Sequence, residues 1–217
     1  MQINIMNEHD TVLNHYLAEM RSVGIQSDPI RFRRNIERIG FLMAYEVSKT
    51  LAYTDNGIAT PLGTAQVRMA DEKIVVGSIL RAGLPMHNGI LDAFDHAENC
   101  FISAYRKSDK NGQLTIHVEY AASPSLTGKI LLLGDPMLAT GGSMELTYNA
   151  LKRFGQPKHV HIMSIIGSRE GVSYLQSKLA GEPVTLWIAA VDPKLNANKY
   201  IVPGLGDAGD LAFGTKL

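Results

Sequence analysis

Residues 129–143 read K-I-L-L-L-G-D-P-M-L-A-T-G-G-S, and this stretch decides the fold class. The apolar run from Ile130 to Leu133 has the length of a strand buried inside a sheet. Asp135 and Pro136 follow, and we expect the strand to end in a turn there because proline has no N–H to donate to a neighbouring strand. Glycines and hydroxyl residues then lead directly into a helical pattern. A buried strand, an acidic turn and a glycine-rich helix start together predict an α/β protein.

The glycine-rich turn at residues 140–143, T-G-G-S, has the layout of a phosphate site. Glycines let backbone N–H groups approach an anion, and the N-terminus of a helix carries partial positive charge. The turn is neither a Walker loop nor a dinucleotide fingerprint, because no lysine follows the glycines and the G-x-G-x-x-G spacing is absent. Ligands of open α/β sheets bind outside the carboxyl ends of the strands, where Asp135 would accept hydrogen bonds from sugar hydroxyls. The alternative is an ordinary strand-to-helix turn that binds nothing.

Beyond this stretch, short apolar runs alternate with amphipathic segments. Strands are predicted at residues 74–80, 100–105, 160–166 and 184–191, and helices at residues 12–20, 29–43, 144–154 and 170–179. Residues 58–69 indicate a hairpin or an edge segment, and residues 114–120 an antiparallel arm able to close over a ligand. Strands that alternate with helices predict a mostly parallel sheet with helices on both faces. The glycine-rich segment 203–210 is predicted to be a loop, neither helix nor strand.

The composition is that of an ordinary globular protein, and the 217 residues fit one domain. The 21 basic and 21 acidic residues cancel, so no overall charge favours a nucleic acid as partner. No signal peptide is recognisable, and no apolar run approaches the roughly 20 residues that span a bilayer, so we expect a cytoplasmic protein without a membrane partner. The single cysteine, Cys100, lies in an apolar run and is expected to be buried in a strand. The seven histidines show no metal-ligand spacing.

Four motifs resemble those of the uracil phosphoribosyltransferase family. The most specific is D-P-M-L-A-T-G-G-S at residues 135–143, which is similar to the family's motif for phosphoribosyl diphosphate (PRPP). The others are I-L-R-A-G-L at residues 79–84, Tyr105 followed by Arg106, and Y-I-V-P-G-L-G-D-A-G-D at residues 200–210. Their order and separations match the family over nearly the whole chain.

The resemblance implies a type I phosphoribosyltransferase fold: a central, mostly parallel sheet with helices on both faces, an antiparallel arm, and a small hood formed by the terminal segments. Within one domain spanning residues 1–217, we expect N-terminal helices at about 8–52, a core at about 70–192 and a base-binding loop at about 198–217. The implied reaction is transfer of the 5-phosphoribosyl group from PRPP to N1 of uracil, which gives UMP and diphosphate and serves pyrimidine salvage.

The resemblance also assigns site residues. PRPP would be bound by Arg81, Arg106, Asp135, Pro136, Met137, Leu138, Ala139, Thr140, Gly141, Gly142, Ser143 and Asp207. Uracil would be bound through the backbones of Ile201, Gly206 and Ala208, with Asp207 between the base and sugar sites. Catalytic roles fall to Asp135, Asp207 and Arg106. Mg2+ is expected to enter with PRPP, without protein ligands assigned to it, and Arg81 and Arg106 would share the diphosphate with the ion.

Relatives further imply a homo-oligomer, a dimer or a tetramer, and GTP as an allosteric activator, although no residue can be assigned to GTP. Two positions depart from the family: Leu211 stands where a basic residue is usual, and Pro85 where glycine is usual. We expect Leu211 to remove an ion pair to Asp207 or Asp210, or a subunit contact. Two alternative functions stay open, a phosphoribosyltransferase for another nucleobase and a non-catalytic sensor of PRPP or UMP.

Overall fold

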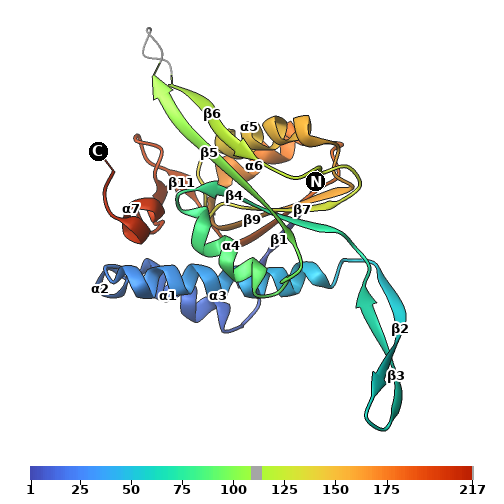
Figure 1. The fold of residues 1–217 in the computed structure, drawn as a ribbon. Helices are drawn as coiled ribbons and strands as arrows, with labels where there is room; N and C mark the ends of the chain where they lie inside the picture. The colour runs from blue at the N-terminus through green and yellow to red at the C-terminus, as the bar shows by residue number, and fades with distance from the viewer. Residues whose placement is uncertain (109–113, 217) are drawn as a thin grey trace.

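The computed structural model describes the backbone of residues 1–108 and 114–216, and their side chains apart from residues 104–119. Its centre is an eight-stranded sheet in the order β1-β10-β9-β7-β4-β5-β6, with the short strand β8 paired to β9 beside this path (Figure 1). The strands of this sheet are β1 (Gln2–Ile5), β4 (Ile74–Leu80), β5 (Glu98–Ser108), β6 (Leu114–Ala122), β7 (Ile130–Gly134), β8 (Met137–Leu138), β9 (His159–Ser168) and β10 (Val184–Asp192).

All neighbours in the sheet are parallel except β5 and β6, which confirms the expected parallel sheet and its antiparallel arm. Strand β7 is buried along its whole length, as its uninterrupted apolar sequence predicts. Strand β1 was not predicted. Its four residues carry too little pattern, and its strand conformation depends on pairing with β10 at the far end of the chain.

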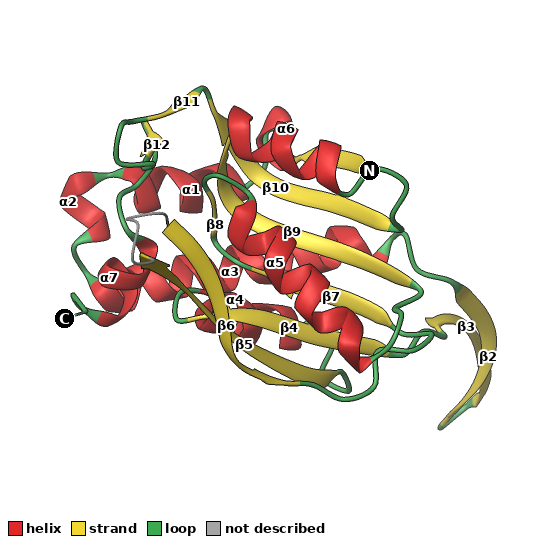
Figure 2. Ribbon diagram, turned by 90° about the horizontal axis from the view of Figure 1, so that it is seen from above, coloured by secondary structure: helices red, strands yellow, loops and turns green. Residues whose placement is uncertain are grey.

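Helices cover both faces of the sheet (Figure 2). They are α1 (Leu13–Arg21), α2 (Val23–Gln26), α3 (Pro29–Ser48), α4 (Gly83–Leu91), α5 (Gly142–Leu151), α6 (Arg169–Lys178) and α7 (Ala208–Phe213), with 3-10 turns at Met6–Glu8 and Lys152–Phe154. Successive side chains of β7 point to opposite faces: Leu131 packs in the core under α5 and α6, and Leu132 in the core under α1, α3 and α4.

Helix α3 is the longest helix and begins where the sequence predicts. The Asp28 carboxylate accepts hydrogen bonds from the backbone N–H groups of Ile30 and Arg31, and Pro29 occupies the first turn. Helix α4 packs so closely on α3 that a Cβ atom at Gly89 would lie 1.9 Å from the carbonyl oxygen of Glu37. Gly89 therefore permits the close packing of α3 and α4, two helices that cover the same face of the sheet.

Strands β2 (Tyr53–Thr60) and β3 (Gly63–Ala70) form the predicted hairpin, which projects away from the sheet (Figure 1). A second pair, β11 (Lys194–Leu195) and β12 (Ile201–Val202), lies near α7 at the other end of the molecule (Figure 2). None of the described helices is both long and apolar enough to cross a membrane.

The loop prediction for residues 203–210 is wrong at its end, because α7 starts at Ala208. The Asp207 carboxylate accepts a hydrogen bond from the backbone N–H of Asp210, 3.0 Å away, and so caps the first turn. Local capping and burial of Ala208 and Ala212 therefore outweigh the low helix propensity of glycine in this segment.

Candidate active site

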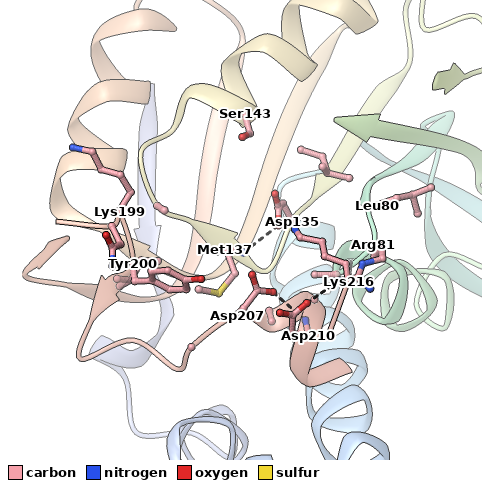
Figure 3. A pocket seen from close by; sticks show the side chains of 18 residues that line it. Leu80, Arg81, Asp135, Met137, Ser143, Lys199, Tyr200, Asp207, Asp210 and Lys216 are labelled. Atoms are coloured by element: carbon pink, nitrogen blue, oxygen red, sulfur yellow. Dashed lines mark hydrogen bonds and ion pairs between the residues drawn. The ribbon is translucent and has the colours of Figure 1, made fainter. Parts of the chain in front are cut away.

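The carboxyl ends of β4 and β7 open into a cavity of about 740 Å3. Its lining comes from the end of β4, the loop after β7, the segment before and after β12, and the C-terminal residues around α7 (Figure 3). This is the edge of the sheet at which α/β proteins place their ligands. Residues 129–143 and 200–210, far apart in the chain, thus share one cavity.

Backbone hydrogen bonds fix the loop after β7 to strand β9. The Asp135 N–H donates to the carbonyl of Met163 at 3.0 Å, and the hydroxyl of Ser164 donates to the Asp135 carbonyl at 2.7 Å. The Asp135 carboxylate accepts a hydrogen bond from the N–H of Met137 at 3.2 Å. Pro136 interrupts the strand as expected, but pairing with β9 then resumes for two residues as β8. The carboxylate of Asp135 is therefore held at the cavity by a rigid backbone.

Gly141 shapes the turn that leads into α5. Its φ is +81°, and a Cβ atom there would lie 2.9 Å from both the Gly171 carbonyl oxygen and the Tyr174 ring. Among the side chains that the structure describes, none caps the helix, so its first N–H groups are available to an anion, as in a phosphate site. Ser143, in the first turn, lines the cavity.

The structure separates the predicted PRPP residues of this loop into two groups. Asp135, Met137, Ala139 and Ser143 line the cavity. Five others belong to the same loop without lining the cavity: Pro136, Leu138, Thr140, Gly141 and Gly142. Leu138 is buried in the core on the α5 side, and Gly141 packs against α6. Both residues therefore anchor the loop to the rest of the fold.

Arg81 lies at the end of β4, after a cis peptide bond with Leu80, and lines the cavity. Its guanidinium donates to the Asp210 carboxylate at 2.9 Å and to the Gly214 carbonyl at 3.2 Å. The predicted cation of the diphosphate site is thus attached to α7 across the cavity. Arg106 lies in β5, paired with Ile116 of β6, and its side chain falls outside the described part of the structure.

All four predicted uracil residues line the same cavity: Ile201, Gly206, Asp207 and Ala208. Gly206 has a φ of +96°, which favours glycine, and Asp207 is the cap of α7. The backbone groups expected to read a base edge therefore come from a turn that a helix cap holds in place.

Two supporting residues were missed by sequence reasoning. Asp192, the last residue of β10, forms a two-pronged ion pair with Arg21 at 2.7 and 2.8 Å and accepts the Gly204 N–H at 2.8 Å. Arg21 also donates to the Gly204 carbonyl at 3.0 Å. The pair ties the glycine-rich turn to α1 and to the sheet. An acidic residue at the end of a predicted strand was the only signal available.

Several cavity-lining residues were also not predicted. They are Ile79, Leu80, Ala82, Asn198, Lys199, Tyr200, Gly209, Asp210 and Lys216. Lys199 has a φ of +64°, rare outside glycine, in a turn where the Asn196 side chain accepts two backbone N–H groups. The two lysines and Arg81 add positive charge around the carboxylates, as an anionic ligand requires.

The expectation that Leu211 removes an ion pair to Asp207 or Asp210, or a subunit contact, stays a prediction. Asp210 has an ion-pair partner in Arg81, and Leu211 packs partly buried against the core under α3. Pro85 lies in the first turn of α4, where its missing N–H leaves no helical hydrogen bond unmade. Cys100 is buried in β5 as predicted, and burial raises the pKa of its thiol above the usual value. Neither Leu211 nor Pro85 is among the residues that line the cavity.

Comparisons with known proteins agree on one family. Residues 7–215 match the family model of uracil phosphoribosyltransferase. A uracil phosphoribosyltransferase of Porphyromonas gingivalis is 51% identical over 217 residues, which is the whole of both chains. One of Methanothermobacter thermautotrophicus is 40% identical over 205 residues, or 94% of this chain and 92% of that protein.

Solved structures agree on the architecture. A protein of Aquifex aeolicus superposes with a TM-score of 0.87 and 29% identity over the whole of both chains. A purine phosphoribosyltransferase of Pyrococcus horikoshii gives a TM-score of 0.50 with 14% identity, over 74% of this chain and 84% of that one, which bears on the fold alone.

Proposed function

Because this chain belongs to the uracil phosphoribosyltransferase family, we propose that it transfers the 5-phosphoribosyl group from PRPP to N1 of uracil. The products are UMP and diphosphate, and the reaction serves pyrimidine salvage. The observation that carries this function is the shared cavity. It brings the loop after β7, Arg81 and the turn at residues 206–208 together at the carboxyl edge of the sheet.

The reaction sets two electrostatic tasks. The bond from the anomeric carbon to the diphosphate oxygen breaks as the bond to N1 of uracil forms, so positive charge builds up on the ribose and negative charge on the diphosphate. Asp135 and Asp207 place carboxylates around the cavity, where they would hold the ribose hydroxyls and stabilise the positive charge. Arg81, and in our proposal Arg106, would stabilise the leaving diphosphate.

The 5′-phosphate would bind at the N-terminus of α5. Ser143 lines the cavity there, and the uncapped N–H groups of this ten-residue helix supply donors without a positive side chain. Uracil would lie against Ile201, Gly206 and Ala208, whose backbone N–H and C=O groups would pair with its acceptor–donor–acceptor edge. Cytosine presents a donor where uracil O4 accepts, and an unpaired polar group in a closed site costs about 1–3 kcal/mol.

Mg2+ fits the donors present. The carboxylate oxygens of Asp135 and Asp207 line the cavity and are hard ligands of the kind that Mg2+ prefers. Within the described residues, no three His, Cys, Asp or Glu side chains gather into a metal site, so we propose that the ion enters bound to PRPP. When bound, it would offset the negative charge of the diphosphate.

Three further properties are proposed from family membership alone: assembly into a homo-dimer or homo-tetramer, cytoplasmic localisation, and activation by GTP. Analytical ultracentrifugation of the purified protein tests the first. Initial rates with and without GTP at subsaturating PRPP test the last, since an activator must raise them.

The experiment that tests the proposed substrate is a panel of uracil, cytosine, hypoxanthine and guanine, each incubated with PRPP and Mg2+ and analysed for nucleotide by chromatography. We expect UMP from uracil and at least about tenfold less product from each other base. A greater rate with hypoxanthine or guanine would assign the cavity to purines. Binding of PRPP without a product from any base would make the protein a sensor.

A further inference from the structure

A second cavity, of about 520 Å3, lies at the opposite edge of the sheet from the candidate active site. We call it the amino-edge cavity, because its lining includes the first residues of β1, β7 and β9 and the start of β10. The segment between α3 and the β2–β3 hairpin closes one side (Figure 2 shows the hairpin at this edge and α7 at the other). Its volume lies within the range of small-molecule sites.

A buried histidine with a free hydrogen-bonding nitrogen lines this cavity. His161 is 4% exposed, and its Nδ1 lies 3.0 Å from Nε1 of Trp187. Indole nitrogen only donates, so Nδ1 accepts and the ring proton is on Nε2. Burial lowers the pKa of His161 to about 4, so the ring is neutral near pH 7. Among the described residues, nothing accepts a hydrogen bond from Nε2, which leaves this N–H to a ligand in the cavity.

The remaining lining combines the rings of His159 and Trp187 with aliphatic and polar side chains, and its formal charges, Lys158 and Glu72, cancel. The rings of His159 and His161 are 4.7 Å apart, and the ring of Trp187 lies beyond His161. The Thr50 hydroxyl donates to the backbone of α3 and keeps its lone pairs for a ligand. Lys158, at the rim, is paired with Glu72 at 2.7 Å, so a phosphate group would have to displace this carboxylate.

From this geometry we propose that the amino-edge cavity binds a neutral nucleobase or nucleoside. The Nε2–H of His161 donates to a carbonyl or ring-nitrogen acceptor of the heterocycle, and the rings of His159 and Trp187 supply its apolar contacts. A planar ring with acceptors fits both features of the lining. A nucleoside triphosphate is disfavoured, because Lys158 is the only Lys or Arg among the described lining residues and its carboxylate partner would have to be displaced. The site is separate from the one used by uracil and PRPP and extends beyond the proposed function.

Trp187 makes the test specific. It is the only tryptophan of the chain, and it lines the amino-edge cavity but not the candidate active site. The full-length protein, first saturated with UMP so that the proposed active site is filled by a charged nucleotide and no free base is present, is titrated with uridine, adenosine, guanosine, hypoxanthine, ribose and GTP while tryptophan fluorescence is recorded. We expect saturable quenching by at least one neutral base or nucleoside. Quenching by none of them, quenching by ribose or GTP alone, or quenching only when the active site is empty would overturn the proposal.

Three variants and one control locate the contact. His161→Phe removes the donor and should weaken binding at least about tenfold, while His161→Gln keeps an acceptor for Trp187 and a donor for the ligand and should bind within about threefold of wild type. His96→Phe, at a side chain that is 98% exposed, is the matched control. Ala52→Phe fills the exposed rim without touching the His161–Trp187 pair, so it tests the site even where His161→Phe fails to fold. Unchanged affinity in a folded His161→Phe or Ala52→Phe protein would refute the assignment.

Discussion

Replacing Asp210 by asparagine tests whether α7 restrains the arginine proposed for the diphosphate. The guanidinium of Arg81 is 2.9 Å from the Asp210 carboxylate, and if Arg81 binds the diphosphate as proposed, PRPP would replace this partner. The two side chains are 39% and 32% exposed, so solvent screens the pair, and such pairs contribute about 0.2–1 kcal/mol. Removing that competition should tighten PRPP binding by about 1.5- to 5-fold, since 1.4 kcal/mol corresponds to a tenfold change.

The assay is the Kd of PRPP by isothermal titration calorimetry at low and at high salt. Asp210→Asn keeps the backbone N–H that Asp207 accepts, so the cap of α7 and the Tm should be unchanged. The matched control is Asp55→Asn, which removes an exposed carboxylate 3.9 Å from Arg68 on the remote hairpin. The gain in affinity should shrink as salt screens the pair. Weaker PRPP binding by Asp210→Asn at an unchanged Tm would refute the reasoning, because Asp210 would then be holding Arg81 in its binding position.

Three further changes address the site, the packing and the pH dependence. Asp207→Asn should keep the cap of α7 and the Tm but lower kcat/KM for PRPP by about tenfold or more. Asp207→Ala should lower kcat/KM in the same way and also lose about 1 kcal/mol of unfolding free energy. A kcat/KM equal to that of wild type in both variants would contradict the proposed role of Asp207 in PRPP binding. Gly89→Ala should destabilise the protein by about 1–3 kcal/mol or more in urea unfolding, because the new Cβ would lie 1.9 Å from the backbone of α3, and an unchanged midpoint would contradict the packing. Burial lowers the pKa of His161 from 6.5 to about 4. Between these two pH values the unfolded chain binds a proton at His161 and the native protein does not. This group should therefore lower the free energy of unfolding by about 3 kcal/mol as the pH falls from 6.5 to 4. Unfolding of His161→Gln should lose that part of the decline, and parallel curves for the two proteins would contradict it.

The part of the fold that could be predicted is the part encoded locally. The apolar run of β7, the turn at Asp135 and the start of α5 follow each other directly, and each carries its own signal of burial, chain reversal or helix initiation. Asp28 and Pro29 mark the start of α3 in the same way. Strand β1 had no comparable signal, because only β10 makes it a strand.

The site was predictable in its motifs and not in its contacts. The cavity does bring Asp135 and Asp207 together, and their roles toward PRPP remain predictions. The pair between Arg81 and Asp210 joins residues 129 positions apart, so no local pattern could indicate it. The start of α7 was readable in principle, since Asp207 stands at a capping position, but the glycines around it favoured a loop.

The amino-edge cavity shows the same limit. The alternation of His159 and His161 is visible in the sequence and places both side chains on one face of a strand. The partner that fixes the His161 tautomer is Trp187, on the neighbouring strand, and strand order and register are properties of the folded sheet.

The proposed function is the transfer of the phosphoribosyl group of PRPP to uracil in the candidate active site. The stoichiometry of the products tests it most directly. The purified protein is incubated with radiolabelled uracil, PRPP and Mg2+, and UMP and diphosphate are quantified over time. We expect one diphosphate released for each UMP formed, with no release when uracil is omitted. Diphosphate release without UMP, or no turnover of either substrate by the folded protein, would contradict it.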